Sequence, residues 1–293
     1  MELKVKNLYK SYRKKEALRN INFTLHQGTY GLLGENGAGK STLMRILTTV
    51  DFQTKGEVLY DEKNIVSMDE DYRDLIGYMP QDYDVYPGFT AKDFLEYMGA
   101  LKGLSKEELK VKIPQVMEFV NLSDVINKKV KTFSGGMKRR IGIAQAIMND
   151  PKILILDEPT AGLDPKERIR FSNIISDMSK DKIVLLSTHI VSDMEAIANE
   201  LIVIKKGEIL EQGKTNELVE KVRGKVWETL ISQEEFESLR EVRTIIHLKQ
   251  ADGKVQVRYV GEEYPMTENT LLEPTLEDYY IYTGGSEGKA ELA

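Results

Sequence analysis

The segment that most constrains the fold is glycine-rich and lies near the N-terminus. It follows a short apolar run, Tyr30–Leu33, and precedes a second one, Leu43–Leu47. This order predicts a strand, a loop and a helix. The loop has the spacing G-x-x-x-x-G-K-[ST] of a phosphate-binding loop, in the context expected for one. Its residues are Gly34, Glu35, Asn36, Gly37, Ala38, Gly39, Lys40, Ser41 and Thr42.

The residue types in this loop suit the binding of nucleotide phosphates. Glycines let the backbone curl so that successive N–H groups point inward. The helix that begins near Gly39 adds unpaired N–H groups and the positive end of its dipole. We expect Lys40 to reach the β- and γ-phosphates and Ser41 to offer its hydroxyl to Mg²⁺. The simpler alternative is a glycine turn before an ordinary helix.

A continuous apolar run, Ile153–Leu156, ends in two adjacent acids, Asp157 and Glu158. Such a run is typical of a strand covered on both faces, and so of a parallel sheet. Ligands bind at the carboxyl ends of the strands in such sheets. We therefore expect Asp157 to act on Mg²⁺, directly or through water, and Glu158 to orient or deprotonate an attacking water. Solvated charges at a strand end are the alternative.

A second anion-binding helix end is predicted at Ser134. This serine is a favourable N-cap for the helix that follows. Gly135 and Gly136 leave the N–H groups of that helix end uncovered, which favours an anion there. The sequence thus predicts two phosphate-binding helix ends in one chain.

The middle of the chain is predicted to be a helical insert in an α/β core. Strand patterns give way to helical periodicity over about residues 84–149. Capping boxes at Thr90 and Ser105 each open a helix. Pro114 lies inside the second pattern, so we expect a kink or a restart there.

A change of pattern after Gly213 predicts a second domain. We place an α/β domain at 1–213, a small α+β domain at 214–283 and a disordered tail at 284–293. Within the small domain, strands are expected at 226–231, 244–248 and 255–260, and a last helix after Thr275.

Composition narrows the classes of partner and location. The net charge of the 293 residues is −6, so bulk electrostatics give no indication of nucleic acid as a partner. Cysteine is absent, which excludes disulfides and thiolate metal sites and suits a reducing cytosol. No run of about 18 apolar residues occurs, so we expect no membrane span and a membrane part supplied by another chain.

The motifs together resemble the ATP-binding subunit of an ABC transporter over about residues 1–213. The matching residues, in order, are Tyr12, Gly34–Thr42, Gln81, Ser134-Gly135-Gly136, Asp157-Glu158, Ala161–Asp164 and Ser187-Thr188-His189. The resemblance implies a P-loop NTPase fold of the ABC ATPase type, with a helical subdomain and an N-terminal antiparallel β-subdomain. It also implies ATP hydrolysis by a head-to-tail dimer, each ATP lying between one phosphate loop and the partner's Ser-Gly-Gly helix.

The resemblance also implies roles for single residues. Tyr12 would stack on adenine, Gln81 would sense Mg²⁺ and the water, Asp164 would act across the dimer, and His189 would hold the γ-phosphate. Phe133 and Met137 stand where the family has leucine and glutamine, and Met137 lacks the amide of that glutamine. With Glu158 and His189 present, we expect a site able to hydrolyse ATP.

The end of the small second domain favours an exporter among the ABC proteins. The sequence Glu273–Tyr280 resembles the C-terminal extension of bacterial drug, antibiotic-immunity and peptide exporters, whose permease is a separate chain. The alternatives are a soluble ABC ATPase acting on a ribosome or DNA, and an importer ATPase with a regulatory C-terminal domain. A single ATPase domain, a short helical insert and the lack of cysteine favour transport.

The resemblance gives the aromatic segment Gln81–Phe89 a role in docking the permease. A buried core loop is the alternative for its aromatic residues. The expected partners are therefore a second ATPase subunit, identical or related, and an integral-membrane permease. A cytoplasmic location, peripheral on the inner face of the cell membrane, follows.

Overall fold

The computed structural model describes residues 1–13, 15–82, 86, 88–251, 253–265 and 268–284. The chain divides into two compact units, Met1–Leu210 and Glu211–Ala293. The division falls inside β10 (Glu208–Lys214), slightly before the boundary at 213/214 that we expected.

A six-stranded sheet is the centre of the first unit, with the strand order β10-β9-β3-β8-β7-β6. Its other strands are β3 (Gly28–Leu33), β6 (Ile76–Met79), β7 (Ile153–Asp157), β8 (Ile183–Thr188) and β9 (Glu200–Lys205). Strands β9, β3, β8, β7 and β6 run parallel. Every residue of β7 and β8 is buried, which explains the continuous apolar runs in the sequence.

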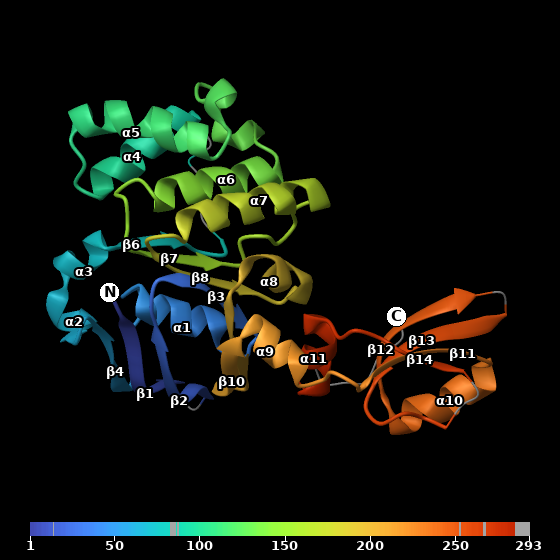
Figure 1. Ribbon diagram of the computed structural model, residues 1–293. Coiled ribbons are helices and arrows are strands. Elements are labelled where there is room, and N and C mark those ends of the chain that lie inside the picture. Colours follow the sequence, from blue (N-terminus) through green and yellow to red (C-terminus); the bar gives the residue numbers. More distant parts are fainter. Residues whose placement is uncertain (14, 83–85, 87, 252, 266–267, 285–293) are drawn as a thin grey trace. The chain divides into compact units, whose positions relative to one another are not determined.

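A second, antiparallel sheet has the order β2-β1-β4-β5. It is formed by β1 (Leu3–Tyr12), β2 (Lys15–Leu25), β4 (Lys55–Tyr60) and β5 (Lys63–Asn64). Helix α1 (Lys40–Leu47) lies between the two sheets (Figure 1). Its buried side chains join both sheets in one core. The predicted α/β fold with an N-terminal antiparallel sheet is confirmed.

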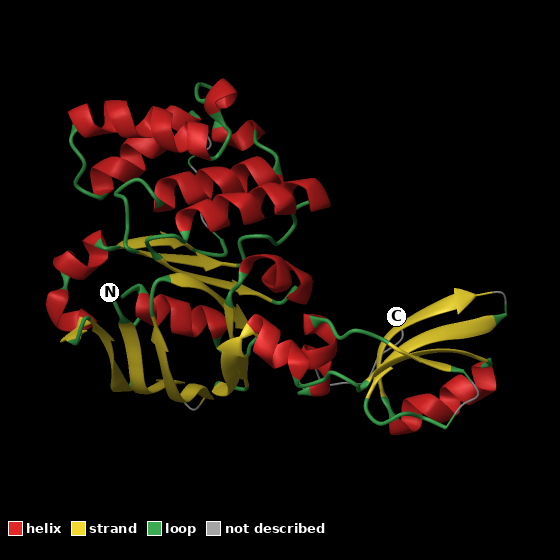
Figure 2. Ribbon diagram, viewed as in Figure 1, coloured by secondary structure: helices red, strands yellow, loops and turns green. Residues whose placement is uncertain are grey.

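The helical region on the other side of the large sheet contains α4 (Ala91–Leu101), α5 (Lys106–Phe119) and α6 (Gly135–Ala146) (Figure 2). Both predicted capping boxes are present, at Thr90 and Ser105. Helix α5 continues through Pro114 without a restart, so of the two expected outcomes the restart is wrong. Pro114 lies on the exposed face, as does Lys110, so water can bind the Lys110 carbonyl that the proline leaves without a donor.

Four further helices connect the strands of this unit: α2 (Ile65–Met68), α3 (Glu70–Asp74), α7 (Pro165–Met178) and α8 (Val191–Ile197). Helix α3 ends at Asp74, just before β6. Its first turn holds Glu70 and Asp71 at the favourable, positive end of its dipole, and its last turn holds Arg73.

The second unit has a four-stranded antiparallel sheet of order β12-β13-β11-β14. Its elements are α9 (Thr215–Glu220), β11 (Val226–Ile231), α10 (Gln233–Val242), β12 (Thr244–Ala251), β13 (Lys254–Val260), β14 (Asn269–Leu271) and α11 (Leu276–Tyr282). Phe236 and Leu239 of α10 pack on one face of this sheet. Arg258 of β13 forms an ion pair of 2.6 Å with the fully buried Asp278 of α11.

Within the part of the chain that the structure describes, every helix is too short or too polar to span a membrane.

Candidate functional site

Four neighbouring parallel strands end at the same edge of the large sheet, and a predicted site residue follows each of them. Strand β3 leads into the loop at Gly34, β6 leads to Gln81, β7 ends in Asp157, and β8 leads to His189. These residues are far apart in the sequence. The parallel register brings them to the carboxyl edge, where open α/β sheets bind their ligands.

The glycines of the loop after β3 meet two different requirements, one of backbone conformation and one of space. Gly39 has a φ of +116°, in the region that disfavours side chains. A Cβ on Gly34 would lie 2.3 Å from the carbonyl oxygen of Ile204 in β9. The loop therefore lies directly against the neighbouring strand, and α1 begins at Lys40 with its first N–H groups facing the loop.

Lys40 points back into the loop with only 5% of its surface exposed. Its Nζ donates to the carbonyl oxygen of Gly34 at 2.6 Å and lies 3.7 Å from the Glu158 carboxylate. Burial lowers the pKa of the Lys40 ammonium, and the charge of Glu158 opposes part of that shift. A buried cation beside helix N–H groups is suited to hold a phosphate.

Ser187 connects the two acids at the end of β7. Its hydroxyl donates to Asp157 Oδ1 at 2.5 Å and accepts from the backbone N–H of Glu158 at 3.0 Å. The contact follows from the sheet register, which pairs Asp157 with Ser187. Glu158 has a φ of +50°, a strained conformation for a residue with a side chain. The Ser187 contact helps to hold that conformation.

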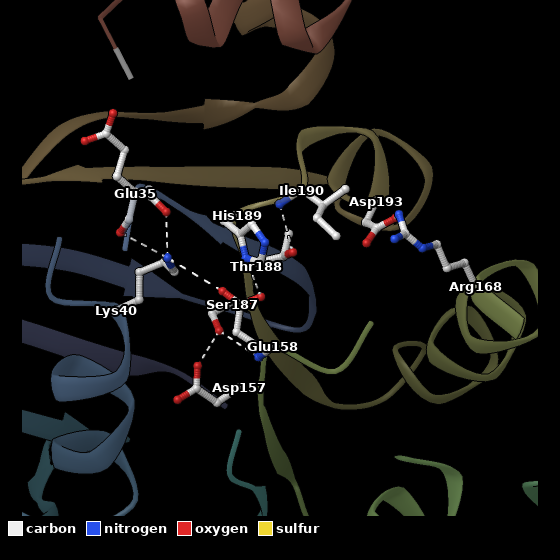
Figure 3. A network of polar contacts seen from close by, with 11 residues as sticks. Glu35, Lys40, Asp157, Glu158, Arg168, Ser187, Thr188, His189, Ile190 and Asp193 are labelled. Atoms are coloured by element: carbon white, nitrogen blue, oxygen red, sulfur yellow. Dashed lines mark hydrogen bonds and ion pairs between the residues drawn. The ribbon is translucent and has the colours of Figure 1, made fainter. Parts of the chain in front are cut away.

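The Glu158 side chain lies between Lys40 and His189 (Figure 3). Its Oε2 is 2.9 Å from His189 Nδ1. The Glu158 side chain is 4% exposed and that of His189 48%. The carboxylate is thus largely withdrawn from solvent, while one edge of the imidazole remains accessible. This arrangement can place a buried base beside a histidine that reaches a ligand.

Tyr12 lies at the end of β1 with 42% of its surface exposed. Its hydroxyl donates to Asp51, and Lys10 Nζ lies 4.6 Å from the ring centroid. Burial and the Asp51 carboxylate raise the pKa of the Tyr12 hydroxyl. The ring is therefore tethered at one end, while part of it stays free to stack on a planar ligand.

A cleft of about 680 Å³ brings most of these residues together. Its volume is within the range of small-molecule sites. Fifteen described residues line it: Tyr12, Lys15, Glu16, Ala17, Arg19, Glu35, Asn36, Gly37, Gly39, Lys40, Ser41, Thr42, Gln81, Glu158 and Lys206. The described lining thus contains Tyr12, most of the loop, Gln81 and Glu158, but neither Asp157, His189 nor the Ser134 motif.

The Ser134 motif forms a separate helix end. The Ser134 hydroxyl accepts from the Met137 N–H at 3.2 Å and caps the twelve-residue helix α6. Ser134 and Gly135 are exposed. The cap involves only the backbone N–H of Met137, so the absence of a glutamine side-chain amide at this position does not affect it. Arg139, one turn further along, donates to the Gln81 carbonyl oxygen at 2.6 Å, which connects this helix to the cleft.

The oxygen donors near the loop fit Mg²⁺. The ion usually takes one or two carboxylates, and waters and phosphates fill its other positions. Ser41 offers a hydroxyl, and Asp157 has one oxygen that is not engaged by Ser187. Among the described residues no cluster of three or more acidic, histidine or cysteine side chains is placed to hold a metal.

Comparisons with known proteins agree with this geometry. The family model described as ABC transporter matches residues 18–161. The ABC transporter ATP-binding protein YxlF of Bacillus subtilis is 38% identical over 246 residues, which cover 83% of this chain and 81% of that protein. The Nod factor export ATP-binding protein I of Cupriavidus metallidurans is 33% identical, covering 90% of this chain and 88% of that protein. This chain belongs to the ABC transporter ATP-binding proteins.

A solved structure extends the comparison to the fold and the assembly. The ATP-binding cassette MJ0796, a dimer bound to ADP and Pi, matches the ABC protein described here with a TM-score of 0.66 and 28% identity. The match covers 72% of this chain and 98% of that one. The ABC protein is thus an ATPase of a family whose cassettes form dimers.

Sequence reasoning missed several residues around the ABC site. Asp51, which holds Tyr12, and Asp193, which pairs with Arg168 at 3.2 Å, gave no motif signal. Ser187 was noted only as the neighbour of His189. Its position at the end of an apolar run, like that of Asp157, was a signal that could have predicted a contact between the two residues.

We predict that Ser187→Ala lowers ATP turnover about tenfold or more while leaving ATP affinity nearly unchanged. The change removes one hydrogen bond from each of two buried groups, which costs about 1–3 kcal/mol per unsatisfied group. Steady-state kinetics and nucleotide titration measure the two effects. Ser179→Ala, which removes a hydroxyl bonded locally to Ser176, is the control. Wild-type turnover in Ser187→Ala would contradict a positioning role for this hydroxyl.

Proposed function

We propose that this ABC ATPase powers the export of a drug, antibiotic, peptide or lipid-like cargo through a separate permease chain. The relative named for Nod factor export aligns over 90% of this chain, which includes most of the second unit. That long match supports an exporter subclass. A peripheral location on the inner face of the cell membrane follows from the proposal.

One observation carries the proposed mechanism: the two helix ends that are suited to bind anions do not share a cleft. The loop end at Lys40 lines the cleft, whereas the exposed Ser134 end is absent from its described lining. A second subunit, identical or related, can supply the missing end. In that pair each ATP lies between one subunit's loop and the other's Ser134–Met137 segment.

Each residue of the cleft then has a role in binding or hydrolysis. Tyr12 stacks on adenine, and residues Gly34–Thr42 hold the phosphates through backbone N–H groups and Lys40. Glu158 orients or deprotonates the attacking water, and His189, held by Glu158, contacts the γ-phosphate. Ser41, Gln81 and Asp157 would hold Mg²⁺, which supplies charge that stabilises the developing negative oxygens.

We predict that Glu158→Gln and Lys40→Ala separate hydrolysis from binding. Glu158→Gln keeps the shape of the side chain but removes the base, so turnover should fall about 10²–10⁴-fold while ATP binding and ATP-driven pairing persist. Lys40→Ala removes the fixed cation beside the phosphates, so ATP affinity itself should fall. Turnover assays, nucleotide titration and the mass of the particle with ATP measure these effects.

The exposed Glu118 of α5 provides the control, and Glu118→Gln should behave like the wild type. Normal turnover in Glu158→Gln would remove Glu158 from its proposed role.

The segment Gln81–Phe89 is the proposed docking site for the permease. Residues 83–85 and 87 lie outside the described residues. Tyr86 is 51% exposed, so the core-loop alternative does not apply to it. Its ring centroid lies 4.9 Å from that of Phe89 and 5.4 Å from that of Tyr97. Exposed, clustered aromatic rings are favoured anchors at interfaces. The Arg139–Gln81 contact connects the start of this segment to the Ser134 helix.

We predict that Tyr83→Ala with Tyr86→Ala leaves the basal ATPase activity of the isolated subunit within about threefold. Cargo-dependent stimulation should be lost and co-purification with the permease weakened, because the aromatic anchors are gone. Val111→Ala, at an exposed apolar side chain of α5, controls for the loss of surface apolar area. Loss of basal turnover or of folding in the double variant would contradict a docking role.

A further inference from the structure

The first turn of α7 holds a carboxylate directly beneath the Ser134 motif. Glu167 Oε2 lies 3.2 Å from Nε of Arg140, a residue of α6. The two side chains are 18% and 10% exposed. The contact is an ion pair without hydrogen-bond geometry at Nε. The charges attract strongly because so little water reaches them.

Arg140 also fixes α6 to a third helix. Its Nη1 donates to the backbone oxygens of Val120 and Asn121, at 3.1 and 2.9 Å, where α5 ends. A planar guanidinium can hold several acceptors in a fixed arrangement. Arg140 therefore joins the end of α5 and the start of α7 to the helix that Ser134 caps.

The packing at Gly136 shows how closely Glu167 approaches the motif. A Cβ on Gly136 would lie 3.2 Å from both Cγ and Oε2 of Glu167. A side chain at this position would displace the carboxylate. The glycine thus leaves the helix end open on one side and leaves room for Glu167 on the other.

Glu167 is equally well fixed to the turn that carries Asp164. The Asp164 side chain accepts from the Glu167 N–H at 2.9 Å and caps α7. The next residue, Arg168, forms an ion pair of 3.2 Å with Asp193 of α8, in the segment that follows His189 (Figure 3). One helical turn therefore contacts both the Ser134 helix and the segment behind His189.

We propose that Glu167 is a positioning residue that holds the Ser134 helix end and the Asp164 turn together as one rigid surface for the partner's nucleotide. The inference rests on the proposed function, in which both segments act across the pair. Fixing them in the unpaired subunit means that less freedom is lost when the pair forms. Glu167 touches no nucleotide and acts only through Arg140 and Asp164.

The test measures ATP-driven pairing in a Glu158→Gln background, where hydrolysis does not reverse it. Adding Glu167→Gln should raise the subunit concentration needed for pairing at least tenfold. The nucleotide affinity of the unpaired subunit should stay near that of the parent, because the cleft of that subunit does not contain Glu167. Its melting temperature should fall by only a few degrees, because Arg140 keeps its two backbone acceptors. A merely structural ion pair would lower the melting temperature without raising the concentration needed for pairing.

Two further variants make the result specific. Arg140→Lys keeps the charge but loses the planar fork, and should weaken pairing in the same way. Arg170→Ala removes the more exposed partner of the same carboxylate, which lies 2.9 Å away, and should leave pairing unchanged. Normal pairing in both Glu167→Gln and Arg140→Lys would overturn the inference. Parallel losses of pairing, nucleotide affinity and thermal stability in both variants would overturn it as well.

Ser134→Arg in the same background separates this inference from the proposed function. It should abolish pairing because its bulk and charge occupy the helix end. Normal pairing of Ser134→Arg would contradict the proposed function itself. Loss of pairing in Ser134→Arg with normal pairing in Glu167→Gln would contradict only the role of Glu167.

Discussion

The parallel pairing of β3, β8, β7 and β6 is the constraint on which the rest of the site depends. Parallel strands have their carboxyl ends at one edge, so four distant segments of the chain meet there. The contact of Ser187 with Asp157 and Glu158 follows directly from this register. So does the position of Glu158 between Lys40 and His189. A change in register would separate all of these side chains.

The same edge provides only half of what the proposed reaction requires. A buried lysine and helix N–H groups lie on one side of the cleft, while the exposed Ser134 end is carried by the helical region. Arg139 connects that region to Gln81, and Arg140 connects it to Glu167. The Arg139 contact joins the helix that would face the partner's nucleotide to a residue of the subunit's own cleft. Nucleotide binding in a subunit's own cleft can therefore affect the Ser134 helix end that this subunit presents to the partner's nucleotide.

Much of the fold could be predicted because local patterns determine it. The buried runs of β7 and β8, the two capping boxes and the strand Val226–Ile231 all follow from neighbouring residues. Helix α10 was missed although Ser232 and Glu235 form a capping box, because the surrounding strands dominated the pattern. The effect of Pro114 depended on which face of α5 meets solvent, and that is decided by packing.

The candidate site was predictable to the extent that short motifs define it. The cleft brings together Tyr12, the loop, Gln81 and Glu158, as the resemblance implies, while their individual roles stay predictions. Partners such as Arg140 and Glu167 could not be predicted, because they are 27 positions apart and belong to no shared motif. Only the packing of α6 against α7 brings them together.

Mixing two inactive variants tests the central claim, that each working site combines one subunit's loop with the other's Ser134 end. Lys40→Ala subunits have an intact Ser134 end, and Ser134→Arg subunits have an intact loop. A mixed pair then contains one complete site. The account predicts that each variant alone hydrolyses almost no ATP and that the mixture regains turnover. A mixture as inactive as its components, with both variants folded and Ser134→Arg still binding ATP, would contradict it.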